Sequence, residues 1–174
     1  MPTPKTTPRE RMIEKSRKWQ IGTYVSRYVA PEFQRMIRAE YGAQPAGYAP
    51  AIIDNCVRQV YRKLGKCVCV TCGAVKAWCG GLGGMHTGHF TGSRRNAILF
   101  LPQNAFPQCP SCNRYRNGMP EQFHLWMLHV HGAAVIAELE ALKRTTRTFS
   151  REELVDMRIE FKRRLKAAEA AMIS

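Results

Sequence analysis

The sequence of 174 residues lacks any apolar run long enough to cross a membrane, which excludes a membrane-spanning class. Its first residues, MPTPKTTPRERMIEKSRK, lack the apolar segment of a secretory signal. Internal repeats and long low-complexity runs are also missing, which excludes a repeat array. We therefore expect a cytoplasmic protein, without a membrane partner, that builds one domain with a core plus arms.

Acidic residues are scarce. Only 13 Asp and Glu stand against 27 Lys and Arg, which gives a formal net charge of +14. Each cation that meets a phosphate releases a condensed counterion, so this balance favours a polyanionic partner. Nucleic acid is the leading candidate. A solubilising surface charge is the alternative.

Seven cysteines are present, and four of them form two Cys-x-x-Cys pairs, Cys69 with Cys72 and Cys109 with Cys112. In a reducing compartment such pairs are typical of metal ligands rather than of disulfides. Four thiolates complete a tetrahedral zinc site and leave no position for water. The sequence therefore predicts one structural Zn²⁺. Cys67 and Cys79 lie outside the paired spacing.

Helix signals dominate the first 65 residues. Thr7, Pro8 and Glu10 predict the start of a basic helix, and a second helix is expected over Pro31–Tyr41. Residues 42–50, GAQPAGYAP, are typical of a linker.

Apolar positions from Ala51 to Leu64 fit one helical face, with Gly65 as the stop. Cys56 is expected in the core on that face.

The second half is predicted to contain a strand over residues 96–104, NAILFLPQN, and three helices. The first of these helices has a stripe of apolar residues for the core and ends at Gly132, and the second covers residues 133–144. The third is long and begins at a capping box formed by Ser150 and Glu153. The stripe of the first helix is Phe123, Trp126, Met127 and Val130, and the inward face of the last is Leu154, Met157, Phe161 and Leu165. Arg158, Lys162 and Lys166 share another face of the last helix, which is either solvated or follows DNA phosphates.

Several motifs occur together from about residue 52 to 168. After the first cysteine pair come GHF at residues 88–90, Asn104, QCPSCNRYRNG, LEALKR and FSREELVDMR. As a composite they resemble the phage recombination protein family NinG (Rap), and the layout resembles the HNH nucleases. The chain departs from the family in its first 50 residues, which hold no cysteine-rich segment, and in the WCGGLGGMH approach to the histidines.

The resemblance implies an α+β, mostly helical fold, with a zinc-bound ββα-metal (HNH-like) core and flanking helices. We expect residues 1–50 to form a basic arm with short helices, and residues 51–174 to form the nuclease domain. It also implies a metal-dependent endonuclease that cuts branched DNA, such as Holliday junctions, during phage recombination. Symmetric cutting would favour a homodimer. The alternative is a zinc-stabilised module that binds nucleic acid without cutting it.

The resemblance also implies roles for individual residues. His89 would be the general base that deprotonates the attacking water, and Asn113 would help to hold a catalytic Mg²⁺ or Mn²⁺. Asn104 would orient the histidine through its amide. His86, where relatives often have an acidic residue, could be a second ligand of the ion if the strand is bulged or turned near Gly88, because residues three apart point to opposite faces.

Each of these side chains has a structural alternative, since histidine and asparagine often serve in turns and caps. Four arginines flank the proposed centre and are candidate phosphate contacts, with exposed turn residues as the alternative. They are Arg94, Arg95, Arg114 and Arg116.

Overall fold

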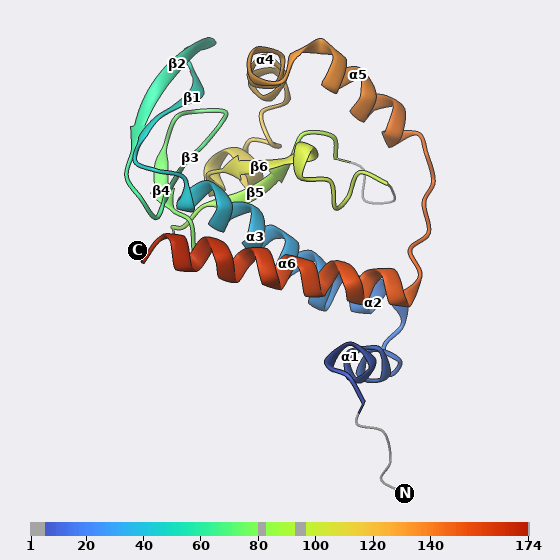
Figure 1. Cartoon of the computed structure of the whole chain (residues 1–174). Coiled ribbons are helices and arrows are strands. Elements are labelled where there is room, and N and C mark those ends of the chain that lie inside the picture. Colours follow the sequence, from blue (N-terminus) through green and yellow to red (C-terminus); the bar gives the residue numbers. More distant parts are fainter. Residues whose placement is uncertain (1–5, 80–82, 93–96, 174) are drawn as a thin grey trace, which may run out of the picture.

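A computed structural model describes residues 6–79, 83–92 and 97–173 of the chain (Figure 1). Its helices are α1 (Pro8–Ser16), α2 (Ile21–Tyr24), α3 (Ala30–Ala43), α4 (Pro120–Val130), α5 (Gly132–Lys143) and α6 (Arg151–Ala171). Three short helical segments are η1 (Val25–Val29), η2 (Pro102–Asn104) and η3 (Ser111–Tyr115). The strands are β1 (Gly47–Ile53), β2 (Cys56–Arg62), β3 (Lys66–Val68), β4 (Val75–Ala77), β5 (His86–His89) and β6 (Ala105–Gln108). Helix predominates over small antiparallel sheets, which confirms the expected mixed α+β class.

Both predicted capping boxes are present. The Thr7 hydroxyl accepts from the Glu10 backbone N–H, and the Glu10 carboxylate accepts from the Thr7 N–H at 2.6 Å. Ser150 and Glu153 repeat this exchange at the start of α6, with a carboxylate contact of 2.7 Å. Each box satisfies backbone donors that the first helical turn leaves free, so these four residues define where the helices begin.

The predicted helix over residues 51–64 is wrong, because this segment forms the antiparallel hairpin β1–β2. Asp54 and Asn55 connect the strands, both with positive φ, 51° and 58°. Two such residues in succession make the turn that matches the twist of a hairpin. Cys56 begins β2 and is exposed, so its predicted place in the core is also wrong. The predicted linker is partly wrong, because residues 47–50 belong to β1.

The predicted strand over residues 96–104 is wrong as well, within its described residues 97–104. Residues 97–100 form turns and are followed by η2, which begins at Pro102. Ile98 and Phe100 are buried from these turns, so their apolar character reflects packing rather than a strand. The partner of β5 is instead β6, and the pairing runs without a bulge from His86↔Gln108 to His89↔Ala105.

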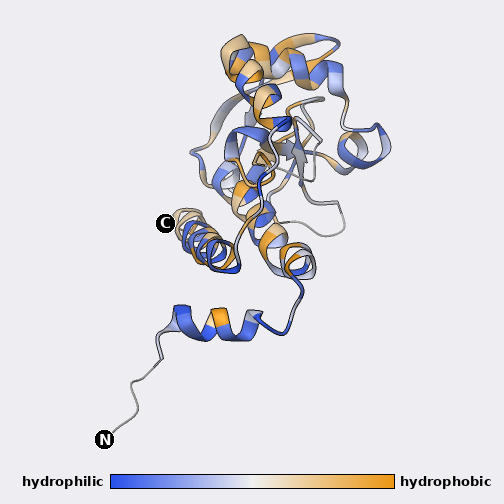
Figure 2. Cartoon of the chain, turned by 90° about the vertical axis from the view of Figure 1, so that its right-hand side faces the viewer, coloured by the Kyte–Doolittle hydropathy of each residue, from blue (hydrophilic) through white to orange (hydrophobic). Residues whose placement is uncertain are grey.

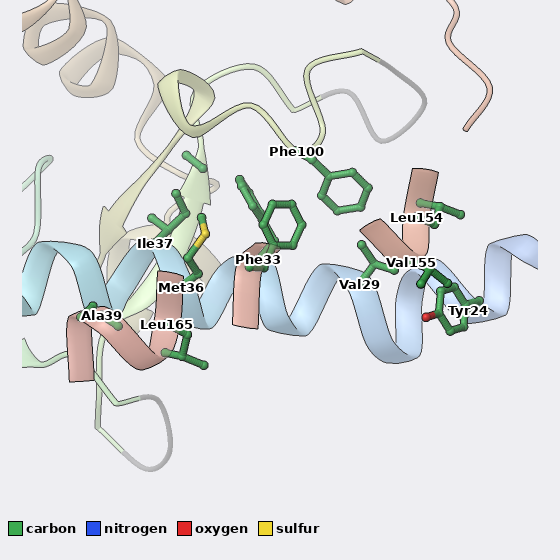
Figure 3. Close-up of a cluster of buried hydrophobic side chains, with 13 residues drawn as sticks. Tyr24, Val29, Phe33, Met36, Ile37, Ala39, Phe100, Leu154, Val155 and Leu165 are labelled. Carbon is green, nitrogen blue, oxygen red and sulfur yellow. The ribbon is translucent and has the colours of Figure 1, made fainter. Parts of the chain in front are cut away.

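The largest core lies between α3 and α6, which run side by side (Figures 1 and 3). Phe33 lies 5.2 Å from Phe161, measured between ring centroids. The predicted inward face of α6 is buried at Leu154, Phe161 and Leu165, whereas Met157 is half-buried. The helices before residue 44 thus share a core with the last helix of the chain.

A second core lies below α4, where Phe123, Trp126 and Met127 are buried as predicted. Val130, the fourth member of the predicted stripe, is 39% exposed, so its expected burial is wrong. Leu125 and Leu128 are exposed on the same helix. Leu125 and Leu128 therefore stay at the surface, although α4 packs on both the hairpin and α5.

Hydrophilic residues dominate α1, which lies next to α6 (Figure 2). A paired contact joins the two helices, in which Arg9 donates to both carboxylate oxygens of Asp156 at 2.6 and 2.8 Å. Among the described residues, no helix combines the length and the apolar character needed to span a membrane.

Candidate metal centre and flanking polar site

The two Cys-x-x-Cys pairs meet at one point. The sulfur atoms of Cys69, Cys72, Cys109 and Cys112 all lie within 4.8 Å of one another. The Cys72 and Cys109 sulfurs are 3.7 Å apart. A tetrahedral zinc with Zn–S bonds of about 2.3 Å requires sulfurs about 3.8 Å apart, so the cluster has the size of a zinc site. These four residues could therefore hold a structural metal such as zinc.

The backbone around the first pair is folded as a tight turn. The Cys69 N–H donates to the Ala74 carbonyl at 2.8 Å, and the Gly73 N–H donates to the Cys69 carbonyl at 2.9 Å. Gly73 has a φ of +75°, which a side chain would disfavour, and a Cβ there would lie 2.8 Å from Ile53 Cδ1. The glycine is thus required for the turn and for its packing on the hairpin.

Polar groups outside the pairs contact the sulfurs. The Thr71 hydroxyl lies 3.4 Å from Cys69 Sγ, and the Gln108 amide donates to the Thr71 oxygen at 3.1 Å. The threonine proton is therefore free to point at the sulfur. The pKa of Cys69 is lowered to about 5, first by a hydrogen bond from Cys72 and then by the one from Thr71, against the effect of burial. Such contacts support the thiolate that a metal requires.

The other cysteines are separate from the cluster. The Cys67 thiol is buried and donates to the Arg38 carbonyl at 3.3 Å, and burial raises its pKa to about 12. Cys56 and Cys79 are exposed. Among the described residues, these four predicted cysteines are the only group of three or more His, Cys, Asp or Glu side chains placed to hold a metal.

His86 lies beside Asn113, as the resemblance implied for a pair of metal ligands. Their nearest side-chain nitrogens, Nδ1 of His86 and Nδ2 of Asn113, are 3.4 Å apart. Asn113 directly follows Cys112 in η3, so the cysteine cluster fixes its position next to β5. The pKa of His86 is lowered by burial and by the charges of Arg38 and Arg114. Its imidazole is thus neutral at pH 7, the form that binds a metal.

His89 lies on the opposite side of β5. The unbroken pairing with β6 gives no bulge at Gly88, so His86 and His89 project from different faces. His89 Nε2 is 3.1 Å from the Leu99 carbonyl, and its ring is 6.2 Å from that of Phe33 in α3. Burial lowers the pKa of His89, although the hydrogen bond to Leu99 opposes this shift. The two histidines are therefore not brought to a single point.

Asn104 is fully buried and fastens the loop that follows β5. Its Oδ1 accepts from the Thr91 N–H at 2.8 Å, and its Nδ2 donates to the carbonyls of Thr91 and Ile98, each at 3.3 Å. Ile98 precedes Leu99, whose carbonyl contacts His89. Asn104 thus supports the partner of the histidine, and it contacts neither the metal cluster nor Asn113 among the described residues.

Two features of the site were not predicted from the sequence. Gly88 lies against Gln108, and a Cβ at Gly88 would be 2.7 Å from the Gln108 Cδ. Arg38 of α3 reaches over β5 and donates to the Trp78 carbonyl at 3.1 Å and to the Thr87 hydroxyl at 3.3 Å. Burial lowers the pKa of Arg38, and no carboxylate of the described residues pairs with it. No local signal reveals these contacts, because their partners are distant in sequence.

The predicted DNA-contacting cations differ in their surroundings. Arg114 and Arg116 are exposed near η3, and Lys166 is exposed on α6, whereas Arg94 and Arg95 lie outside the described residues. Arg158 and Lys162 both approach Glu32, at 3.9 and 3.7 Å. The Arg158 guanidinium also lies 4.8 Å from the Tyr28 ring centroid. Arg158 and Lys162 therefore already interact with other side chains of the protein.

Fold and site together define a basic α+β protein with a cluster of four cysteines that could hold a metal. The chain belongs to the NinG family, since residues 44–171 match the family model described as Bacteriophage Lambda NinG protein. The match covers about three quarters of the chain and includes every cysteine of the cluster, but it excludes α3 and Arg38. Comparisons with curated proteins and with solved structures found no match. Membership of this phage family suggests a role related to recombination.

Proposed function

We propose that this chain is a metal-dependent DNA endonuclease of the HNH type that acts on branched recombination intermediates. The observation that carries the proposal is the hydrogen bond between His89 Nε2 and the Leu99 carbonyl. A carbonyl only accepts, so Nε2 must carry the proton and Nδ1 is left with a free lone pair. This is the tautomer that a general base needs.

In the proposed reaction, a water oxygen attacks the phosphorus and its proton passes to His89 Nδ1. A bond from phosphorus to oxygen forms, and the bond from phosphorus to the 3′ oxygen of the DNA breaks. The departing oxygen takes a proton from solvent, and His89 later returns its own proton to water. Asn104 acts as a positioning residue, because it holds the loop that carries the Leu99 carbonyl.

His86 and Asn113 are the proposed residues for a catalytic Mg²⁺ or Mn²⁺. A half-turn of the Asn113 amide would present its carbonyl oxygen, the kind of ligand that Mg²⁺ and Mn²⁺ prefer, beside His86 Nδ1, an imidazole nitrogen that more often binds transition metals. The ion would neutralise the negative charge that develops on the phosphate. Two neutral ligands next to Arg38 and Arg114 bind a cation weakly, so the DNA phosphate is expected to complete the site.

Arg38 is proposed to bind the phosphate that is cut. It is half-buried, lies across β5 beside Thr87, and has no carboxylate partner among the described residues. A desolvated guanidinium gains most from an anion that can take two parallel hydrogen bonds, as a phosphate does. In the described sheet β5 pairs only with β6, so its other edge is unpaired. A DNA strand that lies along this unpaired edge could contact His86 on one face of β5 and His89 on the other.

One observation favours a second function, that of a zinc-stabilised DNA-binding module without catalysis. His89 packs on Phe33, on the face of β5 away from Asn113, which is also how a purely structural histidine would lie. The test is to incubate the protein with linear duplex, single-stranded, flap and four-way DNA, each with Mg²⁺, Mn²⁺ or EDTA. Cleavage of branched DNA that requires the added ion supports the nuclease, whereas binding without cleavage under every condition supports the module.

Symmetric cutting of a junction by a homodimer would need an interface. The exposed apolar side chains of α4, Leu125 and Leu128, are the proposed contact because they are 40% and 45% exposed on one helix. Sedimentation of the free protein and of the protein with a four-way junction measures whether a dimer forms. A protein that stays monomeric on DNA would cut the two strands one after the other.

A further inference from the structure

A cavity of about 240 Å³ lies between the hairpin and α4, and Val68 and Val70, the chain neighbours of Cys69, form part of its wall. Its walls include Tyr41 from α3, Tyr48 from β1, Arg62 from β2, and Trp126 and His131 at and after the end of α4. The space is below the range of about 300–1,000 Å³ that is usual for drug-sized ligands. It therefore suits a single small ring system.

One polar side chain of the cavity wall has unused capacity. Arg62 is only 6% exposed, and its guanidinium donates to neutral oxygens alone, the carbonyls of Gln44 and Pro45, both at 2.8 Å, and the side-chain oxygen of Gln44. These three bonds leave some of the five guanidinium N–H groups for a polar ligand. His131 Nε2 is sealed within the protein, so His131 contributes its ring to the wall rather than a polar contact.

The rings of the cavity are held in place. The Trp126 indole N–H donates to the Pro50 carbonyl at 2.8 Å, which fixes the indole ring against β1. His131 packs on Trp126 with ring centroids 5.4 Å apart. A flat ligand that enters would thus meet rigid aromatic walls at little cost in side-chain entropy.

Two tyrosines of the hairpin are exposed to solvent, Tyr48 in the cavity wall and Tyr61 beside it on the neighbouring strand. Tyr48 and Tyr61 are direct partners across the hairpin, with ring centroids 5.4 Å apart, and are 72% and 54% exposed. Ile52 lies four residues after Tyr48 on the same face of β1 and packs in the core below α4. The tyrosines therefore belong to the hairpin face that turns toward α4.

We infer that this cavity and the tyrosine pair bind an unpaired nucleobase. A base offers a flat face for the tyrosines and polar edges for Arg62, and the net charge of +14 attracts the nucleic-acid chain that carries the base. In a duplex the bases are stacked and cannot enter, so the site would distinguish DNA with unpaired bases from linear duplex. The inference rests on the DNA-binding part of the proposed function and names the DNA feature that the protein selects.

The test measures affinity in EDTA, where nothing is cut, for a single-stranded oligonucleotide with one 2-aminopurine and for a duplex of the same length. Tyr48→Ala together with Tyr61→Ala should weaken single-strand binding by about 5-fold to 100-fold, the usual contribution of stacking, and duplex binding by less than about 2-fold. Tyr115→Ala is the matched control, because Tyr115 is 76% exposed on η3 and does not line the cavity.

A second variant keeps the tyrosines and fills the cavity. Val130→Phe, at a wall position near its mouth, should remove the change in 2-aminopurine fluorescence on binding while duplex affinity stays the same. Equal losses for both DNAs, or no loss for either, would overturn the inference. A variant that changes from dimer to monomer but keeps its affinity for the single strand would also overturn it. If the wild type binds no DNA, the proposed function fails together with the base site. If the wild type cleaves DNA but the variants bind the single strand as tightly as the wild type, only the base site is refuted.

Discussion

The imidazole of His89 and the carbonyl of Leu99 are 3.1 Å apart, at Nε2 and O. Leu99 lies in the turns that follow β5, and Asn104 holds these turns through Ile98 and Thr91. The tautomer of the neutral His89 ring is therefore set by a backbone carbonyl, and the turn that carries this carbonyl is held by one buried amide.

This relationship predicts the pH dependence of cleavage. Burial lowers the pKa of His89 below its ordinary value of about 6.5. The neutral form is the base, so the rate should rise with pH through this lowered pKa and become constant above it. Rates measured from pH 5 to 8 at saturating ion provide the check. A midpoint above the ordinary histidine value would contradict the assigned environment.

Asn113→Ala should raise the concentration of Mg²⁺ or Mn²⁺ needed for half-maximal cleavage, because it removes a ligand and leaves His89 intact. At saturating ion much of the rate should return. Ser111→Ala is the control, since Ser111 is exposed on the same η3 segment. The ion titration decides the point, and an unchanged ion requirement would exclude Asn113 as a ligand.

Gly88→Ala should destabilise the fold by about 1–3 kcal/mol, because the added Cβ would lie 2.7 Å from Gln108 Cδ inside a packed site. Gly92→Ala is the matched control. Among the described residues nothing lies within 4 Å of a Cβ at that position, and its backbone has no positive φ, so a change within about 0.5 kcal/mol is expected. Urea unfolding of both variants measures the difference, and equal stabilities would refute the close approach.

Cys109→Ser should release the metal and unfold the centre of the protein, because removal of one thiolate opens a four-ligand site. Cys79→Ser should keep the metal, since Cys79 is exposed and outside the cluster. Zinc per chain, measured on both purified variants alongside the wild type, tests this. A folded wild type without zinc would contradict the structural role.

Local chemistry made part of the fold predictable. Thr7 with Glu10 and Ser150 with Glu153 each satisfy backbone groups three residues away, so their sequence spacing is enough to define the helix starts. The cysteine cluster was predictable for a similar reason, because two short turns each bring a pair of sulfurs together.

The hairpin was missed because its residues fit two periodicities. Ile52 and Val57 satisfy a helical face as well as they satisfy paired strands. The deciding signal was the Asp54-Asn55 pair, both with positive φ, in the turn between the strands. Gly65, interpreted as a helix stop, instead follows β2 with a φ of +72°.

Much of the candidate site depends on contacts between distant segments. Arg38 reaches Thr87 across 49 positions, and Gln108 reaches Thr71 across 37. Neither contact leaves a pattern in the chain, because no spacing rule links a helix residue to a strand that follows so much later. The opposite faces of His86 and His89 did follow from strand geometry, once the absence of a bulge was known.

The central claim, that His89 acts as a base, is tested most directly by cutting a four-way junction with wild type, His89→Ala and His129→Ala at matched zinc content. His129 is exposed on α4 and serves as the control. We expect His89→Ala to bind the junction like the wild type but to cut it about 10²-fold more slowly or worse, with His129→Ala unchanged. Equal cleavage rates for wild type and His89→Ala would contradict the claim.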